Sequence, residues 1–209
     1  MGPSNGNLNT EDKQFTGNHF THYDRSKDMA EAKVREYIEK GLEAVIVNPS
    51  RVYGPGILSR SNAVTKIISL YIRGKWRIIP GNGLCIGNYV YVDNVVDCHI
   101  SAMHKGRTGE RYLAGGENLS FNDFFETLSR VSGVKYRMFL LPFDLIMMIA
   151  RIIQFTSNIT GWPPAITPAF VRRYNNNWAL SSEKAIQELE YKPGTIEEGL
   201  KKTIEWIKN

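Results

Sequence analysis

Apolar residues recur along the chain with two spacings, one typical of amphipathic helices and one typical of buried strands. Ala30, Val34 and Ile38 follow the helical spacing and predict a helix at residues 21–40, which Gly41 would end. The next apolar run, at residues 44–47, is short and continuous, as in a strand that is covered on both faces.

The same alternation continues to the last residues. Further strands are predicted at residues 89–92, 112–114 and 136–139, and further helices at 63–73, 93–102, 120–131, 143–155, 167–174, 183–189 and 196–207. Strands and helices that alternate in this rhythm predict an α/β fold with an at least partly parallel sheet.

Composition and charge narrow the class of protein. The chain has 209 residues, 26 Lys and Arg against 21 Asp and Glu, and 42% hydrophobic residues, which suits one domain or a domain with a small lobe. The basic residues are scattered among acidic ones, so we expect no nucleic-acid partner. Cys85 and Cys98 lack the paired spacing of a zinc site and the four histidines share no ligand spacing, so we expect no metal. We expect a reducing, cytoplasmic setting.

The most apolar stretch, residues 139–155, contains Asp144 and Arg151 and is shorter than the ~20 apolar residues that cross a bilayer. We therefore expect no stable membrane insertion and interpret the stretch as a helix that covers a pocket or the core.

Tyr23 and Lys27 are the residues with the clearest chemistry. Four residues apart on a predicted helix, they share one face about one turn apart. A cation beside a phenol favours the phenolate, which makes a tyrosine a usable general acid or base. Taken alone, the pair is more often a surface contact than a catalytic pair, because both residue types are common.

Neighbouring motifs support the catalytic interpretation. From Tyr23 onward the chain resembles the extended short-chain dehydrogenase/reductase family, whose members are NAD(P)-dependent epimerases, dehydratases and reductases. The resemblance is carried by YDRSK at residues 23–27, VNPSRVYGPG at 47–56, YVYVDNVV at 89–96 and GERYL at 109–113. Asn48, Pro49, Ser50 and Arg51, with the apolar helix after Pro142, are most similar to the dihydroflavonol 4-reductase and hydroxysteroid dehydrogenase branch.

The resemblance implies a partial Rossmann-like parallel sheet with a small C-terminal substrate-binding lobe. It also implies that Tyr23 exchanges a proton with the reacting oxygen and that Lys27 assists it and binds the ribose of NAD or NADP. The cofactor-binding segment would be Pro49, Ser50, Arg51 and Val52, which leaves a strand beside the nicotinamide ring. We expect residues 1–209 to form a single incomplete NAD(P)-binding-type domain, with substrate-lobe segments at about 56–88 and 135–209.

Two departures from the family pattern shape the functional hypothesis. The chain carries no strand and glycine-rich turn that would seat a pyrophosphate, so we expect the C-terminal part of a longer enzyme, with weak cofactor affinity and self-association when alone. Asn88 stands near the place where sugar-nucleotide epimerases carry a phosphate-binding arginine, and Arg77 is a possible substitute or a solvated side chain. We therefore expect an oxidoreductase that acts on a small, rather apolar carbonyl substrate. The alternatives are a nucleotide-sugar epimerase or dehydratase and a non-catalytic binding module.

Overall fold

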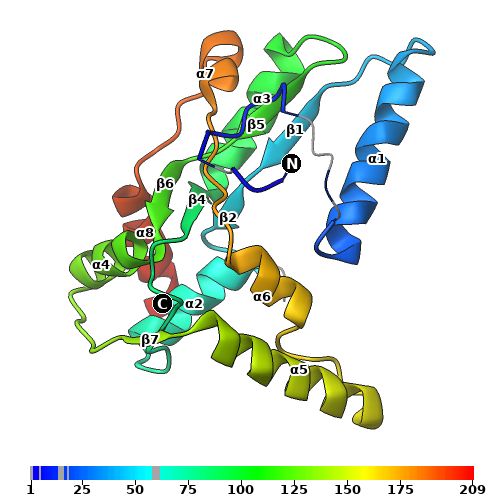
Figure 1. Ribbon diagram of the computed structural model, residues 1–209. Coiled ribbons are helices and arrows are strands. Elements are labelled where there is room, and N and C mark those ends of the chain that lie inside the picture. The colour runs from blue at the N-terminus through cyan, green and yellow to red at the C-terminus, as the bar shows by residue number, and fades with distance from the viewer. Residues whose placement is uncertain (1, 5, 14–16, 18, 58–61) are drawn as a thin grey trace.

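The computed structural model describes residues 2–4, 6–13, 17, 19–57 and 62–209 (Figure 1). Its helices are α1 (His22–Ile38), α2 (Ala63–Ile72), α3 (Val92–Lys105), α4 (Phe121–Ser132), α5 (Phe143–Thr160), α6 (Pro168–Tyr174), α7 (Glu183–Leu189) and α8 (Ile196–Lys208). Its strands are β1 (Ile46–Pro49), β2 (Arg51–Tyr53), β3 (Ile78–Pro80), β4 (Ile86–Tyr91), β5 (Arg111–Ala114), β6 (Glu117–Ser120) and β7 (Phe139–Leu141). The predicted α/β class is confirmed.

The described strands form three small sheets. β1 pairs in parallel with β5, and β3 pairs in parallel with β7. In the central sheet, β4 lies between β2, to which it is parallel, and β6, to which it is antiparallel. The parallel pairs agree with the Rossmann-like sheet that the motifs imply.

The sequence prediction missed three strands, β2, β3 and β6, and it expected a strand at residues 136–139 where the structure has β7 at Phe139–Leu141. β2 lies in a stretch that Pro49 and the following glycines made look like a loop, but the chain stays extended there and pairs Arg51 with Tyr89 of β4. β6 is largely polar and follows two glycines, so it carries no apolar alternation. Its pairing with β4 comes from tertiary contacts.

Two apolar cores hold these sheets. The larger core lies between β4 and the helices α2, α4 and α8, and contains Ile68, Tyr71, Leu128 and Leu200, each almost fully buried. The smaller core packs α3 and α7 against the β1–β5 pair around Tyr112 and Leu189. Ser120 and Thr195 begin α4 and α8 as N-caps with capping boxes, which satisfies the first backbone amides of both helices.

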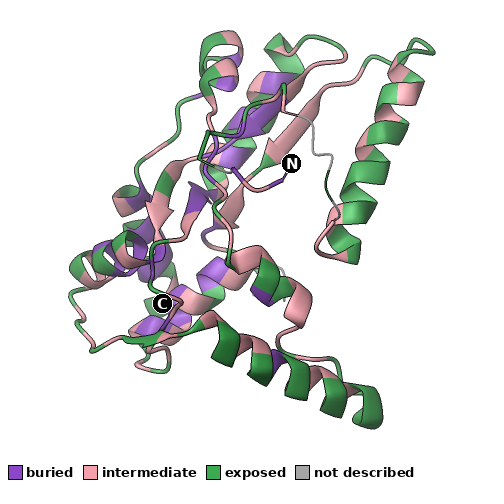
Figure 2. Cartoon of the chain, in the orientation of Figure 1, coloured by how far each residue is buried: buried purple, intermediate pink, exposed green. Residues whose placement is uncertain are grey.

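Helix α1 stands apart from both cores. It has no buried residue, and it lies on the side of β1 away from β5 (Figures 1 and 2). Among the described residues, no strand pairs with that side of β1. The apolar positions that predicted an amphipathic helix therefore have no apolar layer to pack against.

Helix α5 is the longest helix and is also largely exposed (Figure 2). Ala150 is its only buried residue, and Met148, Ile152 and Phe155 are more than half exposed on its outer face. Within the part of the chain that the structure describes, no helix is long and apolar enough to cross a membrane.

Candidate active site

Tyr23 and Lys27 lie at the start of α1, where the sequence predicted them. Thr21 precedes the helix as its N-cap, and its hydroxyl accepts a hydrogen bond from the Asp24 amide at 3.1 Å. The Lys27 ammonium lies 5.6 Å from the centroid of the Tyr23 ring, and the Tyr23 side chain is 65% exposed. The two side chains therefore share one face, with the phenol open to a ligand.

An ion pair connects this end of α1 to the C-terminal part of the chain. Arg173 of α6 forms a hydrogen-bonded ion pair with Asp24, the residue after Tyr23, and the Arg173 guanidinium also packs 4.8 Å from the Trp178 ring. Since α1 buries no side chain, this contact is one of the few that fix the position of Tyr23.

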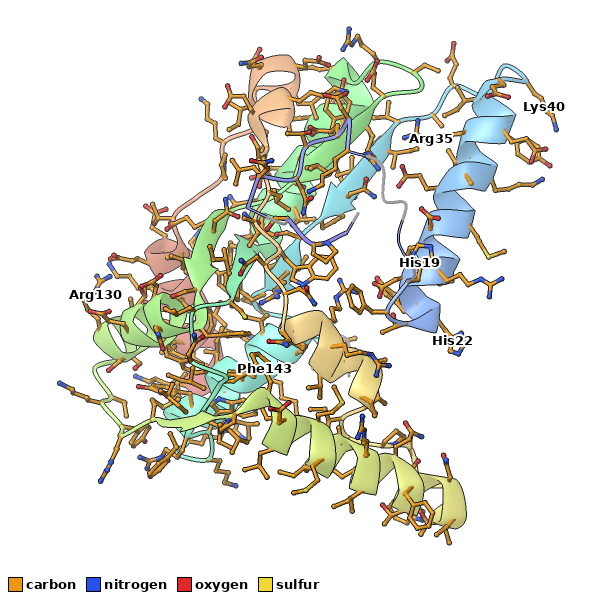
Figure 3. All side chains as sticks on the ribbon, viewed as in Figure 1. His19, His22, Arg35, Lys40, Arg130 and Phe143 are labelled. Atoms are coloured by element: carbon orange, nitrogen blue, oxygen red, sulfur yellow. The ribbon has the colours of Figure 1, made fainter. Side chains whose placement is uncertain are left out.

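A second polar contact holds the middle of α1 against the β1–β5 pair. Glu31 accepts hydrogen bonds from Arg35 at 3.0 Å and from Arg111 of β5 at 3.1 Å, and Arg35 lies on the side of α1 that faces β1 (Figure 3). Burial alone would raise the pKa of Glu31, but the hydrogen bond from Arg35 and the charge of Arg111 outweigh burial and lower the pKa below 4.5. Glu31 therefore stays ionised and keeps α1 close to the sheet.

The predicted cofactor segment, Pro49 to Val52, runs from the end of β1 into β2. The Ser50 amide donates to the Ala114 carbonyl oxygen at 3.1 Å, so the backbone here belongs to the sheet. The Ser50 hydroxyl and the Asn48 amide oxygen are buried without a hydrogen-bond partner among the described residues. Buried polar atoms are rarely left unsatisfied, so these two atoms fit a polar ligand such as a carboxamide at this strand end.

The side chain of Arg51 turns away from that strand end. Its guanidinium carbon lies 5.1 Å from the centroid of the Tyr174 ring, 5.5 Å from that of Tyr89 and 5.8 Å from that of Phe121. A contribution of Arg51 to cofactor binding would thus come from its backbone. Sequence reasoning did not foresee this aromatic environment, because its rings come from three distant segments.

An open cavity of about 600 Å³ lies near these rings, between the turn after β3, the start of α5 and the segment after α6. It is lined by Gly81, Asn82, Leu84, Cys85, Leu140, Pro142, Phe143, Asn175 and Asn177. Neither Tyr23 nor Lys27 lines it, whereas Phe143, the first residue of α5, does; Phe143 is labelled in Figure 3.

Asn88 and Arg77 have structural roles. Asn88 is 1% exposed; its amide donates to the Gly116 carbonyl at 2.8 Å and accepts from the Gly116 amide at 2.9 Å, which ties β4 to the start of β6. Arg77 stacks on Tyr136, with the guanidinium carbon 3.7 Å from the ring centroid. Asn88 thus has its polar groups satisfied within the protein, and Arg77 is a packed side chain rather than a freely solvated one.

The cysteines are poorly suited to nucleophilic chemistry. Burial raises the pKa of Cys98 to about 11 and also raises that of Cys85, so both thiols stay protonated at neutral pH. Among the described residues, no group of three or more His, Cys, Asp or Glu side chains is arranged to hold a metal ion.

Comparison with known families decides the class of this protein. The model of the NAD dependent epimerase/dehydratase family matches residues 1–115, a region that contains Tyr23, Lys27 and the segment 49–52. The chain belongs to this family. The resemblance to extended short-chain dehydrogenases/reductases is thereby confirmed, and NAD(P) is the cofactor of the family.

Curated members of the family match nearly the whole chain. Short-chain dehydrogenase/reductase family 42E member 1 of Bos taurus is 29% identical and covers 91% of this chain, which corresponds to 52% of that protein. A putative dihydroflavonol 4-reductase of Synechocystis sp. is 27% identical over 90% of this chain and 54% of its own length. The chain therefore spans about half the length of these curated relatives.

Solved structures with the same fold match the whole chain. The crystal structure of gox2253 superimposes with a TM-score of 0.79 and 28% identity, over 100% of this chain and 63% of that chain. A dTDP-glucose 4,6-dehydratase from Bacillus anthracis, solved in complex with NAD, gives a TM-score of 0.72 at 19% identity, over 99% of this chain and 58% of its own. At that identity the second likeness concerns the fold alone.

Proposed function

We propose that this chain supplies the proton-transferring pair and the substrate lobe of an NAD(P)-dependent oxidoreductase that interconverts a carbonyl and a carbinol on a small, largely apolar compound. The observation that carries the proposal is the Tyr23–Lys27 pair. Both residues lie within the region that matches the family, and they are one helical turn apart on α1. The Lys27 ammonium is 5.6 Å from the centroid of the exposed Tyr23 ring.

Each residue of the pair has a distinct task in this proposal. Tyr23 donates its phenolic proton to the carbonyl oxygen during reduction and takes a proton from the carbinol during oxidation. Lys27 stabilises the resulting phenolate and donates hydrogen bonds to the ribose. When bound, NAD(P) donates or accepts the hydride at its nicotinamide ring.

The segment Pro49, Ser50, Arg51 and Val52 would lie against the nicotinamide. The unpartnered Ser50 hydroxyl and Asn48 amide oxygen supply one donor and one acceptor for a carboxamide at the end of β1. Ligands in open α/β sheets bind at the carboxyl ends of parallel strands, which supports this position.

The free side of β1 is the expected contact for the glycine-rich half of the enzyme. Strands of that half would pair with β1 and bring an apolar layer under α1, and without it the exposed edge would promote self-association. Residues 56–88 and 135–209 would form the substrate lobe, since every residue that lines the 600 Å³ cavity comes from these two segments.

Two other functions use the same residues. A nucleotide-sugar epimerase or dehydratase would also need Tyr23 and Lys27. A putative dihydroflavonol 4-reductase is among the relatives that match 90% of this chain, which favours the reductase. A non-catalytic binding module would keep the cavity and would not need the Tyr23 phenol.

Turnover by the full-length protein separates these functions. With a panel of aldehydes and ketones, the reductase consumes NADH or NADPH in proportion to product, whereas an epimerase converts UDP-glucose or dTDP-glucose with no net change in cofactor. The 209-residue chain should bind either cofactor at least tenfold more weakly than the full-length protein in calorimetric titration, because it lacks the pyrophosphate-binding turn. Epimerisation without net cofactor use would contradict the proposal, as would full cofactor affinity in the 209-residue chain.

A further inference from the structure

The guanidinium of Arg51 is surrounded by aromatic rings. Tyr89 of β4, Phe121 of α4 and Tyr174 of α6 all have their ring centroids within 6 Å of its central carbon. Such rings attract a cation through their faces and shield it from water, so the charge of Arg51 acts in a medium of lower effective dielectric constant than at an open surface.

Among the described residues, Arg51 has no carboxylate partner. Its hydrogen bond within the described part of the chain is a long one of 3.3 Å to the Tyr89 hydroxyl, and no Asp or Glu forms an ion pair with it there. The residues outside the described ranges include no Asp or Glu. A guanidinium carries five N–H donors, so most of the donors of Arg51 are available to an oxyanion.

The guanidinium lies close to the cavity. Its charge opposes the burial-driven rise of the pKa of Cys85, and Cys85 lines the cavity. Tyr174, which stacks on Arg51, is followed directly by Asn175, another lining residue. Arg51 is not one of the lining residues, but it is only partly buried and its guanidinium lies next to residues that border the cavity.

Gly87 makes room for this arrangement. A Cβ atom at residue 87 would lie 2.2 Å from Nη1 of Arg51, so any larger residue would displace the guanidinium. Arg51 therefore brings a cation to β4, next to the position where Asn88 supplies none. Sequence reasoning assigned Arg51 to the cofactor segment and did not place its charge beside Gly87, because Arg51 belongs to β2, 36 residues earlier in the chain.

We propose that Arg51 binds an oxyanion group of the substrate, a carboxylate or a phosphate, in the cavity beside Cys85. This inference rests on the proposed function and refines its substrate class: a carbonyl compound with an apolar body and one anionic group. Carboxylates and phosphates match the planar donor pattern of a guanidinium. A partly shielded cation with no counter-ion among the described residues favours their binding.

The first experiment measures oxyanion binding without turnover. The side-chain Nε–H signal of Arg51, assigned by its loss in Arg51→Met, is followed by NMR while inorganic phosphate, pyrophosphate and benzoate are added to the 209-residue chain at constant ionic strength. We expect saturable shifts with dissociation constants on the order of 1 mM for at least one anion. Arg51→Met, which retains apolar bulk between the rings, should weaken binding at least tenfold, measured by ligand-observed NMR. Arg51→Lys, which keeps the positive charge, should retain part of the anion binding.

The control variant is Arg172→Gln. Arg172 is exposed, neighbours the same segment and carries the same charge, so its removal tests a non-specific effect of net charge. We expect the anion dissociation constants of Arg172→Gln to lie within twofold of those of the parent. Thermal unfolding of each variant, monitored by circular dichroism, checks that the fold is retained.

The second experiment uses the full-length protein and a matched pair of aldehydes, 4-formylbenzoate and its methyl ester. We expect Arg51→Met to lower the ratio of kcat/KM for the acid to that for the ester at least tenfold, and Arg172→Gln to leave this ratio within twofold. If neither aldehyde is reduced while oxyanions still bind through Arg51, the reductase function fails and the anion site stands. If folded Arg51→Met binds all three anions as the parent does, or the parent binds none, Arg51 is a packing residue and the inference is overturned.

Discussion

Arg173 and Asp24, which are 149 residues apart in sequence, form an ion pair between α6 and α1. Asp24 follows Tyr23 directly, and Arg173 precedes Tyr174, whose ring stacks on Arg51. Helix α6 thus contacts the start of α1 through one residue and the aromatic environment of Arg51 through the next. The position of the phenol therefore depends on α6.

Removal of this ion pair should loosen the start of α1. We expect Arg173→Gln to speed hydrogen exchange of the first amides of α1 about fivefold, which corresponds to a partly exposed ion pair worth about 1 kcal/mol. The neighbouring exposed residue provides the control, since Arg172→Gln should leave the rates unchanged. Equal exchange in both variants would show that Asp24 and Arg173 do not anchor the helix.

Glu31 should make the stability of the chain dependent on pH. Its pKa is lowered in the folded state, so its contribution is present above its ordinary pKa of 4.5 and is lost as the pH falls through the folded value. Relative to Glu31→Gln, the parent should be more stable by about 1 kcal/mol at pH ~7, and this difference should shrink between pH ~5 and ~3. Urea unfolding of the parent and of Glu31→Gln at several pH values measures this difference in stability. A difference that grows toward low pH would contradict the assigned direction.

Gly116 should tolerate no side chain. A Cβ atom there would lie 2.1 Å from the Tyr89 carbonyl oxygen and 3.1 Å from the Val90 Cα, both of which are backbone atoms of the central sheet. We expect Gly116→Ala to lower the free energy of unfolding by about 2–3 kcal/mol. In Gly194→Ala the nearest atoms, at 3.2 Å or more, belong to flexible side chains, so we expect less than about 1 kcal/mol. Similar unfolding midpoints for the two variants would contradict this reading of the β4–β6 junction.

The free side of β1 should cause association of the 209-residue chain. An unpaired parallel strand beside a helix without a buried face presents both backbone donors and apolar surface. Sedimentation velocity should show species larger than a monomer at high concentration, and co-expression with the glycine-rich half should convert them to a defined heterodimer or to a smaller assembly. A monodisperse monomer at high concentration would contradict this expectation.

Local sequence patterns predicted much of the fold and only part of the site. Helices with strong caps or clear periodicity, such as α4 after Ser120 and α8 after Thr195, lie within a residue or two of their expected bounds. Strand β6 and the environment of Arg51 could not be predicted in this way, since both depend on partners from distant segments. The Tyr23–Lys27 spacing is local, which is why the sequence alone could predict a shared helix face.

The direct test of the central claim compares Tyr23→Phe with Lys27→Met in the full-length protein. If the phenol transfers the proton and the lysine also binds the ribose, Tyr23→Phe should lower kcat by ~10²–10⁴ and leave the cofactor dissociation constant within about twofold, whereas Lys27→Met should impair both. The measurement is kcat together with the cofactor dissociation constant for each variant. Turnover of Tyr23→Phe within about threefold of the parent would contradict the account and leave the pair as a surface contact between two residues of one helix.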